Sequence, residues 1–425
     1  MEYLVVTAVL LLMLAVGVPI YIVLGAISGV LLLLEGMPLL SIGQIYVDHL
    51  NSLTLLAIPF FVMSATFMER GGIAAALIDF ANVLVGRMTG GLAVAGVLAT
   101  TVFAAICGSS VATAVALGVI LVPAMIEQKY ERPFAVGLVG ASGTMGILIP
   151  PSLAFIVYAM IAEESVPRLF LAGVVPGIMQ AGLFIAYAVW SANRRGYPKA
   201  PQISSKEAGS RTLKALPALL IPVVILGGIY SGIVTVTEAA GVAAFLSIVV
   251  SVMFYGGCKV RDILPLIGMS MRRTATIIAI IMTAVSFGHW MTSSGGPQQL
   301  ADAISNANLK PWQFLIIINI FFLILGTFLE VMAIMLITLP IILPLLAPMG
   351  NDPIHFAVVM VINMELALIT PPIGLNLFVL SSATSTPLSE VTKGVLPFML
   401  LMLVLLILVT YIPAISLWLP TLVYG

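Results

Sequence analysis

The chain has 425 residues, of which 61% are hydrophobic and only 8% are charged, and its formal net charge is zero. Because water-soluble domains carry about 25% charged residues, most of this chain cannot face water, and we expect no nucleic-acid partner. Charge-free runs of 18 or more residues recur from end to end, which predicts an all-α polytopic protein surrounded by a lipid bilayer.

The first charge-free run covers residues 3–34. It has no basic leader and no small-residue cleavage pattern, so we expect a first helix rather than a signal peptide. A straight helix of this length would measure about 48 Å against a hydrocarbon core of about 30 Å. The run must therefore tilt, kink near Pro19 or fold back.

Residues 88–126 form an uncharged region with the sequence "CGSSVATA" at 107–114 near its midpoint. Its length allows either two full spans or a re-entrant hairpin. A tip of Gly, Ser and Ala favours close packing inside protein over a water-facing loop, so we predict a hairpin. Two ordinary helices that pack through small residues are the alternative.

The next apolar run, 133–162, contains Pro150 and Pro151. A proline at position i removes the hydrogen bond to the carbonyl at i−4, so this pair releases the carbonyls of Gly146 and Ile147. Each unpaired carbonyl would cost several kcal/mol in hydrocarbon unless a cation or a water-lined cavity receives it. We predict a broken helix here; the alternative is that the prolines only kink it.

Residues 194–214 are the longest polar stretch and hold six basic residues against one acid, which predicts a cytoplasmic linker. Counting spans in both directions from this linker places all but two of the 17 basic residues on the cytoplasmic side, the exceptions being Arg168 and Lys310. The same count places the C-terminus in the periplasm.

The second half repeats the features of the first. "PPSLAFIVYAM" at 150–160 and "PPIGLNLFVLS" at 371–381 are separated by an offset of 221 residues. We predict a second hairpin at about 311–351 and a second broken helix at 353–389. The two ends of this hairpin lie on the periplasmic side, whereas those of the first hairpin lie on the cytoplasmic side. The chain then consists of two inverted-topology repeats, 1–193 and 215–425, which is the plan of many secondary transporters.

Each broken helix directs a half-helix C-terminus, with about −0.5 charge, toward the bilayer midplane. Oxygen ligands without soft competitors suit a hard monovalent ion, so we expect two sodium sites. The ligands predicted from the residues are the released carbonyls together with Ser109, Ser110, Thr113 and Thr370.

The motifs "GSSVATA", "GTMGILIPPS", "TEAAG" and "LALITPPIGLNLFV" together resemble the large membrane subunit of the tripartite ATP-independent periplasmic (TRAP) transporters, the DctM- and SiaM-like proteins. The resemblance covers essentially the whole chain. It implies sodium-driven uptake of an organic acid, such as a C4-dicarboxylate or sialic acid, by an elevator mechanism in the inner membrane of a bacterium or archaeon. The partners it implies are a small four-helix membrane subunit and a periplasmic substrate-binding protein.

The resemblance also implies two ion sites. One maps onto Ser109, Ser110, Gly146, Ile149 and Pro151, and the other onto Gly326, Ala367, Thr370 and Ile373. Ala367 stands where glycine is expected in such a break.

Three polar residues are candidates for substrate contact. Ser110 and Ser152 are placed to direct hydroxyl groups toward the midplane. Asn376 offers an amide to a substrate carboxylate, or else it bridges two helices.

We expect three acidic residues to have structural roles or to be solvated, and not to bind an ion or the substrate. We expect Glu238 to lie in the first turn of a helix capped by Thr237. We expect Glu330 and Glu365 to lie at solvated helix ends near the membrane interface.

We predict a carrier and no enzyme. The absence of a Gly-Lys dipeptide excludes a phosphate-binding loop in this chain, although a permease energised by a separate ATPase remains an alternative. A sodium/carboxylate symporter without a binding protein is another. An intramembrane serine protease would need a base near Ser109 or Ser110, and the histidines lie far away in sequence.

Overall fold

The computed structural model describes residues 2–197, 199, 204–306 and 309–425, and these residues form helices without any β-strand. Seven of the described helical segments are long and apolar enough to cross a membrane. They are Leu53–Arg70, Ser110–Glu127, Val166–Arg195, Ser205–Tyr230, Val236–Phe254, Val260–Ser293 and Leu388–Tyr411. The prediction of an all-helical, multi-pass membrane protein is confirmed.

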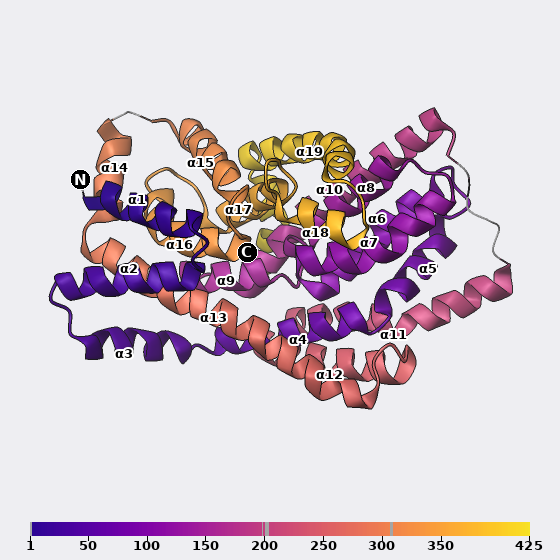
Figure 1. Ribbon diagram of the computed structural model, residues 1–425, viewed down its shortest axis with the longest axis horizontal. Helices are drawn as coiled ribbons and strands as arrows, with labels where there is room; N and C mark the ends of the chain where they lie inside the picture. The colour runs from indigo at the N-terminus through magenta and orange to yellow at the C-terminus, as the bar shows by residue number, and fades with distance from the viewer. Residues whose placement is uncertain (1, 198, 200–203, 307–308) are drawn as a thin grey trace.

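The first apolar run folds back on itself. Helix α1 (Glu2–Ala15) ends before Pro19, and α2 (Ile20–Leu34) starts directly after it and packs against α1 (Figure 1). Pro19 supplies the break because a proline has no N–H to continue the helix. Helix α3 (Leu39–Leu50) follows.

One group of helices is built around the long helix α13 (Ile263–Ser293), which packs against α2 and α4 (Ala57–Arg70) (Figure 1). Helix α12 (Val236–Val249) lies on α4 and on α11 (Ser205–Tyr230). Helix α5 (Ile73–Val85) packs on α11 of this group and on α6 (Gly91–Cys107), and so connects the group to the rest of the protein.

The start of α12 has a different cap from the predicted one. The N-cap is Thr235, whose side chain and the Glu238 side chain form a reciprocal capping box. The prediction of Thr237 was wrong, because its hydroxyl donates instead to the Leu53 carbonyl at 2.9 Å. The capping role of Glu238 is confirmed, because its carboxylate accepts from the Thr235 N–H at 2.8 Å.

Two helix pairs have short turns where hairpins were predicted. The first pair is α6 and α7 (Ser110–Glu127), joined through Gly108 and Ser109. The second is α15 (Pro311–Gly326) and α16 (Val331–Leu346), joined by residues 327–330. That these pairs are re-entrant and related by an inverted repeat remains a prediction.

Both predicted helix breaks are present. Helix α8 (Arg132–Thr144) and a 3₁₀ turn (Met145–Ile147) precede the first Pro-Pro pair, and α9 (Leu153–Ala162) follows it. Helix α17 (Pro353–Leu368) and α18 (Leu375–Ala383) flank the second pair. Both Pro-Pro peptide bonds are cis. Residues 134–144 and 354–368 are all buried, so α8 and α17 form the centre of the core.

Some boundaries differ from those expected. The second broken helix ends at Ala383 rather than near 389, and α19 (Leu388–Tyr411) starts soon after. The apolar run to the C-terminus is not one span, because it breaks before Pro413 and continues as α20 (Ala414–Tyr424), which packs on α10 (Val166–Arg195) and α17. Helix α14 (Gly296–Asn306) lies between α13 and α15 in the chain.

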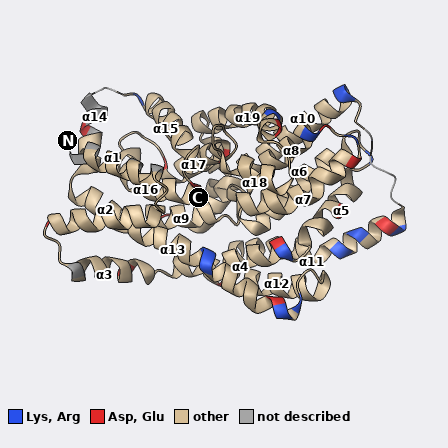
Figure 2. Ribbon diagram, in the orientation of Figure 1, with Lys and Arg blue, Asp and Glu red and all other residues tan. Residues whose placement is uncertain are grey.

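The predicted linker 194–214 is partly helical. Helix α10 continues to Arg195, and α11 already starts at Ser205, while residues 198 and 200–203 lie outside the described residues. Figure 2 shows Lys and Arg gathered at the ends of α10 and α11 and around α4 and α12. This clustering agrees with the charge asymmetry from which the cytoplasmic side was predicted.

Candidate functional site

The tip of the first helix pair touches the first helix break through the backbone. A Cβ added to Gly146 would lie 2.7 Å from the carbonyl oxygen of Ser109, and one added to Gly108 would lie 2.9 Å from that of Pro151. Only glycine allows approaches this close, so these positions require it. The structure thus brings Ser109, Gly146 and Pro151 together, as the resemblance implied.

The second pair also touches the second break, but here a glycine of the helix pair meets a side chain of the break. A Cβ added to Gly326, at the end of α15, would lie 2.4 Å from the Cβ of Ala367 on α17. The contact therefore needs one glycine, and here the helix pair supplies it rather than the break. This arrangement explains why alanine is tolerated at 367.

Two predicted ligand hydroxyls are oriented by carbonyl groups. The Thr113 hydroxyl donates to the Ser109 carbonyl at 2.7 Å, and the Thr370 hydroxyl donates to the Leu366 carbonyl at 2.6 Å. A hydroxyl whose proton is used in this way has only lone pairs left to offer. Such an oxygen can coordinate a cation through its lone pairs but cannot donate a hydrogen bond to an anion.

Two carbonyls that the Pro-Pro pairs remove from helical bonding, those of Ile147 and Ala367, are satisfied by the protein. The Ser152 hydroxyl donates to the Ile147 carbonyl, and the Thr370 N–H donates to the Ala367 carbonyl at 3.1 Å. Ser152 is fully buried and also caps α9 by accepting from the Phe155 N–H. The prediction that its hydroxyl contacts the substrate is therefore not supported by its position.

Asn376 bridges two helices. Its Nδ2 donates to Ser110 Oγ at 2.6 Å, which ties α18 after the second break to the start of α7. Both side chains are buried. Of the two interpretations of Asn376, the structure favours the bridge between helices.

A cavity of about 470 Å³ joins the two tips and the two breaks. One wall consists of the first tip and the residues beside the first break; a second consists of the start of α16 and the residues beside the second break; α13 and α2 close the third. The lining residues are Ile20, Gly108, Ser109, Ser110, Val111, Ile147, Leu153, Arg273, Thr276, Ile277, Ile280, Glu330, Val331, Met332, Leu368 and Leu375.

Arg273 is the one basic residue among the described residues that line this cavity. Its Nη1 donates to Glu69 Oε2 at 3.1 Å and lies 3.5 Å from Thr66 Oγ1. Its side chain is 44% exposed, so the ion pair leaves part of the side chain accessible at the cavity. From the sequence alone, Arg273 is only one of the basic residues that mark the predicted cytoplasmic side, because the sequence does not show which face of α13 meets the tips.

The two acids expected at solvated ends occupy different environments. Glu330 caps α16 by accepting from the Met332 N–H at 3.1 Å, and it lines the cavity. Glu365 has no exposed surface and lies near the end of the fully buried α17. The prediction of a solvated end is wrong for Glu365, since tertiary packing covers α17 on every side.

Of the nine residues of the two implied ion sites, Ser109 and Ser110 line this cavity and the other seven do not, Ile149 and Ile373 among them. The Ile149 side chain packs against Gly177 of α10, and the Ile373 side chain is 41% exposed. Their side chains are apolar, so either residue would contribute to an ion site only through its backbone.

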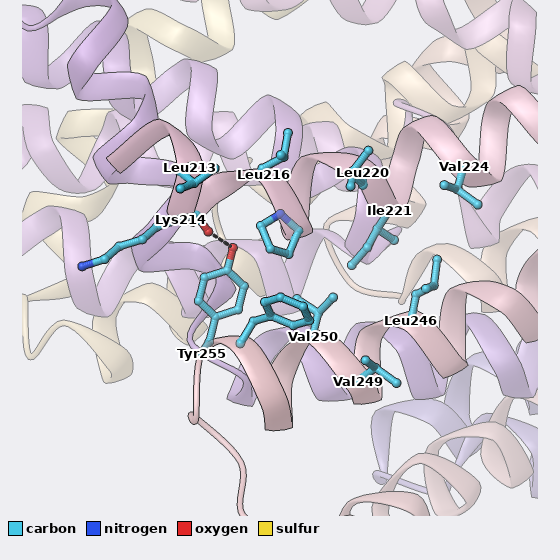
Figure 3. A pocket seen from close by; sticks show the side chains of 12 residues that line it. Leu213, Lys214, Leu216, Leu220, Ile221, Val224, Leu246, Val249, Val250 and Tyr255 are labelled. Atoms are coloured by element: carbon cyan, nitrogen blue, oxygen red, sulfur yellow. Dashed lines mark hydrogen bonds between the residues drawn. The ribbon is translucent and has the colours of Figure 1, made fainter. Parts of the chain in front are cut away.

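A larger groove of about 850 Å³ lies between α11 and α12 (Figure 3). Leu213, Leu216 and Leu220 line it, and the Tyr255 hydroxyl donates to the Lys214 carbonyl at 2.7 Å at one end. These leucines are well exposed, and the lining is overwhelmingly apolar. No helix-pair tip and no helix break lines this groove, whereas both tips, both breaks and Arg273 line the smaller cavity, so the cavity at the tips is the better candidate site.

Known proteins resemble this chain over almost its full length. The family model described as tripartite ATP-independent periplasmic transporter, DctM component, matches residues 7–415. The chain is 47% identical over 368 residues to the C4-dicarboxylate TRAP transporter large permease protein DctM of Pseudomonas aeruginosa, with 86% of each chain covered. It is 39% identical over 438 residues to the Rhodobacter capsulatus protein of the same name, with 99% of each covered.

A solved structure shares the fold at much lower identity. The Alcanivorax borkumensis YdaH transporter matches with a TM-score of 0.60 and 15% identity, over 89% of this chain and 88% of that one. At this identity the likeness concerns the fold alone.

Proposed function

The chain belongs to the DctM component family of the tripartite ATP-independent periplasmic transporters, and we propose that it takes up a C4-dicarboxylate driven by a sodium gradient. The observation that carries this proposal is the convergence of both helix-pair tips and both helix breaks on one cavity. Segments that lie far apart in the sequence meet there, and each brings polar backbone or hydroxyl groups.

The cavity has a suitable size for a small dianion and one basic residue that could meet a carboxylate. Its volume of about 470 Å³ lies within the range of small-molecule sites. Arg273 offers a planar, charged fork that matches a carboxylate, and Glu69 holds it in place. The substrate class follows the two relatives named above, which are described as C4-dicarboxylate transporters.

Sodium ions would bind where the tips meet the breaks. Backbone oxygens near Gly146 and Ala367 and the oriented hydroxyls of Thr113 and Thr370 form two sets of oxygen ligands. Two inward-moving sodium ions gain about 2.3 kcal/mol each per 100 mV of membrane potential, before any concentration gradient is counted. Bound ions would stabilise the tips against the breaks and so complete the substrate cavity.

An elevator movement along α13 would give alternating access. The substrate cavity contacts α13 between Arg273 and Ile280, near the end predicted to be cytoplasmic. A second cavity of about 470 Å³ lies between α13 from Val285 to Thr292 and residues of α3, α9 and α16. The two spaces lie at different heights on one helix, which suits a unit that slides between them.

The family's three-part composition gives the expected partners. A small membrane subunit would assemble with this chain in the inner membrane, and a periplasmic binding protein would deliver the substrate. The chain itself would form the path through the membrane.

The test is uptake of radiolabelled succinate by proteoliposomes that contain this chain, its small subunit and its binding protein. We expect uptake under an inward sodium gradient without ATP, and none when potassium replaces sodium. Uptake that requires ATP and ignores sodium would overturn the proposal. Uptake that persists without the binding protein would overturn the tripartite part alone.

A further inference from the structure

Glu365 lies in the protein centre without a charged partner. It has no exposed surface, and neither of its carboxyl oxygens has a hydrogen-bond partner in the described part of the chain. The surroundings that act on its carboxyl group are the apolar interior and the neighbouring Gln180 side chain, with no basic residue among them. A carboxyl group in such a place is either protonated and neutral or, when ionised, requires a compensating positive charge.

Gln180, on α10, has its amide nitrogen fixed by Thr144. The Thr144 hydroxyl donates to the Ala141 carbonyl at 2.8 Å, so it can only accept from Gln180 Nε2, which lies 3.3 Å away. The other end of the amide, Oε1, is buried and has no donor in the described residues. Glu365 and Gln180 thus contribute three buried oxygens that have no donor within hydrogen-bond distance in the described residues, and the second Nε2 proton of Gln180 is the one donor beside the Glu365 carboxyl group.

The position of this cluster relates it to both helix breaks. Thr144 precedes Gly146 by two residues, and Glu365 precedes Ala367 by two. The offset between Thr144 and Glu365 is 221 residues, the same as between the two Pro-Pro pairs. Gln180 therefore lies next to the equivalent position of each broken helix and contacts both.

We propose that the Glu365 carboxylate and the Gln180 amide oxygen bind a sodium ion, a third ion beyond the two expected at the helix breaks. Hard oxygen ligands favour an alkali ion, and the described residues contain no group of three His, Cys, Asp or Glu side chains that would hold a divalent metal. This inference rests on the sodium-coupled function proposed above. Its consequence is that occupancy of one interior site links α8, α10 and α17.

A third ion changes the charge that accompanies each substrate. Succinate carries two negative charges, so uptake with two sodium ions is electroneutral and uptake with three moves one net positive charge inward. Glu365→Gln removes the carboxylate but keeps the shape and polarity of the side chain. We expect wild-type uptake to generate an inward current, and Glu365→Gln uptake to proceed with less than one-tenth of that current per succinate.

Sodium binding gives a second measurement that does not need transport. Titration of purified protein in nanodiscs with radioactive sodium should show one ion fewer for Glu365→Gln than for wild type. Gln180→Leu should weaken the same ion at least tenfold, and Glu365→Asp should retain it. The matched control is Glu127→Gln, which removes an exposed carboxylate at the end of α7 and should leave both readouts unchanged.

Two outcomes separate this inference from the proposed function. If wild type takes up succinate without sodium dependence, the proposed function fails and this inference fails with it. If wild type is sodium-driven but Glu365→Gln keeps the same current per succinate and the same number of bound ions, the inference alone is overturned. The latter result together with a changed pH dependence of uptake would assign a proton, not sodium, to Glu365.

Discussion

Asn376 donates a hydrogen bond of 2.6 Å to Ser110 although 266 residues separate them in the chain. The bond joins the half-helix after the second break to the tip of the first helix pair. An ion or substrate that moves either element must therefore act on the other. This contact links the two halves of the chain beside the cavity.

Removing this bond should show a coupling between the two residues. Each of Asn376→Ala and Ser110→Ala leaves a buried polar partner unsatisfied, which costs about 1–3 kcal/mol. The double variant should cost less than the sum of the singles, with a coupling of about 0.5–3 kcal/mol. Thermal unfolding of the purified protein in detergent measures the three values; strict additivity would contradict the contact.

Gly146→Ala should separate the first tip from the first break. The new Cβ would lie 2.7 Å from the Ser109 carbonyl oxygen, and relieving an overlap of this kind costs about 1–3 kcal/mol. We expect the sodium concentration for half-maximal uptake to rise at least about tenfold, which corresponds to 1.4 kcal/mol. Gly182→Ala on α10 is the control, since a Cβ there meets nothing within 4 Å.

The second contact allows a rescue experiment. Gly326→Ala would bring two methyl groups together, because Ala367 Cβ lies 2.4 Å from the added Cβ position. Ala367→Gly removes one of them, so the double variant should regain most of the sodium-dependent uptake that Gly326→Ala loses. A double variant as inactive as the single one would show that the contact between α15 and α17 is not what the alanine disturbs.

Arg273→Gln should weaken substrate binding with little effect on folding. A hydrogen bond to a charged group contributes about 1.5–3 kcal/mol, so the KM for succinate should rise about tenfold or more. Arg273→Lys keeps the charge but loses the fork and should recover only part of the affinity. Arg272→Gln changes the exposed neighbour on α13, which does not line the cavity, and should leave KM unchanged.

The sequence predicted the parts of the site that depend on local chemistry. The Pro-Pro pairs located both helix breaks, and "CGSSVATA" located a turn between two helices at Gly108 and Ser109. These features are local, because a proline acts on the turn that precedes it and a small-residue tip allows close packing wherever it lies.

The features that the sequence did not predict all depend on tertiary packing. Arg273 was visible as a charge, but its place in the cavity depends on which face of α13 meets the tips. Glu365 was expected near water, since neither its spacing nor its neighbours show that α17 is enclosed on every side. Thr235 was overlooked as the cap of α12 because the helix starts two residues earlier than expected.

We propose that oxygens at the two tip-and-break contacts bind the sodium ions that power uptake. Replacing Ser110 and Thr370 together with phenylalanine would fill both contacts while the remaining helices stay available for membrane insertion. We predict that this double variant inserts and assembles as wild type does, yet takes up less than one-hundredth as much succinate under an inward sodium gradient. Wild-type rates of sodium-driven uptake in that variant would contradict the account.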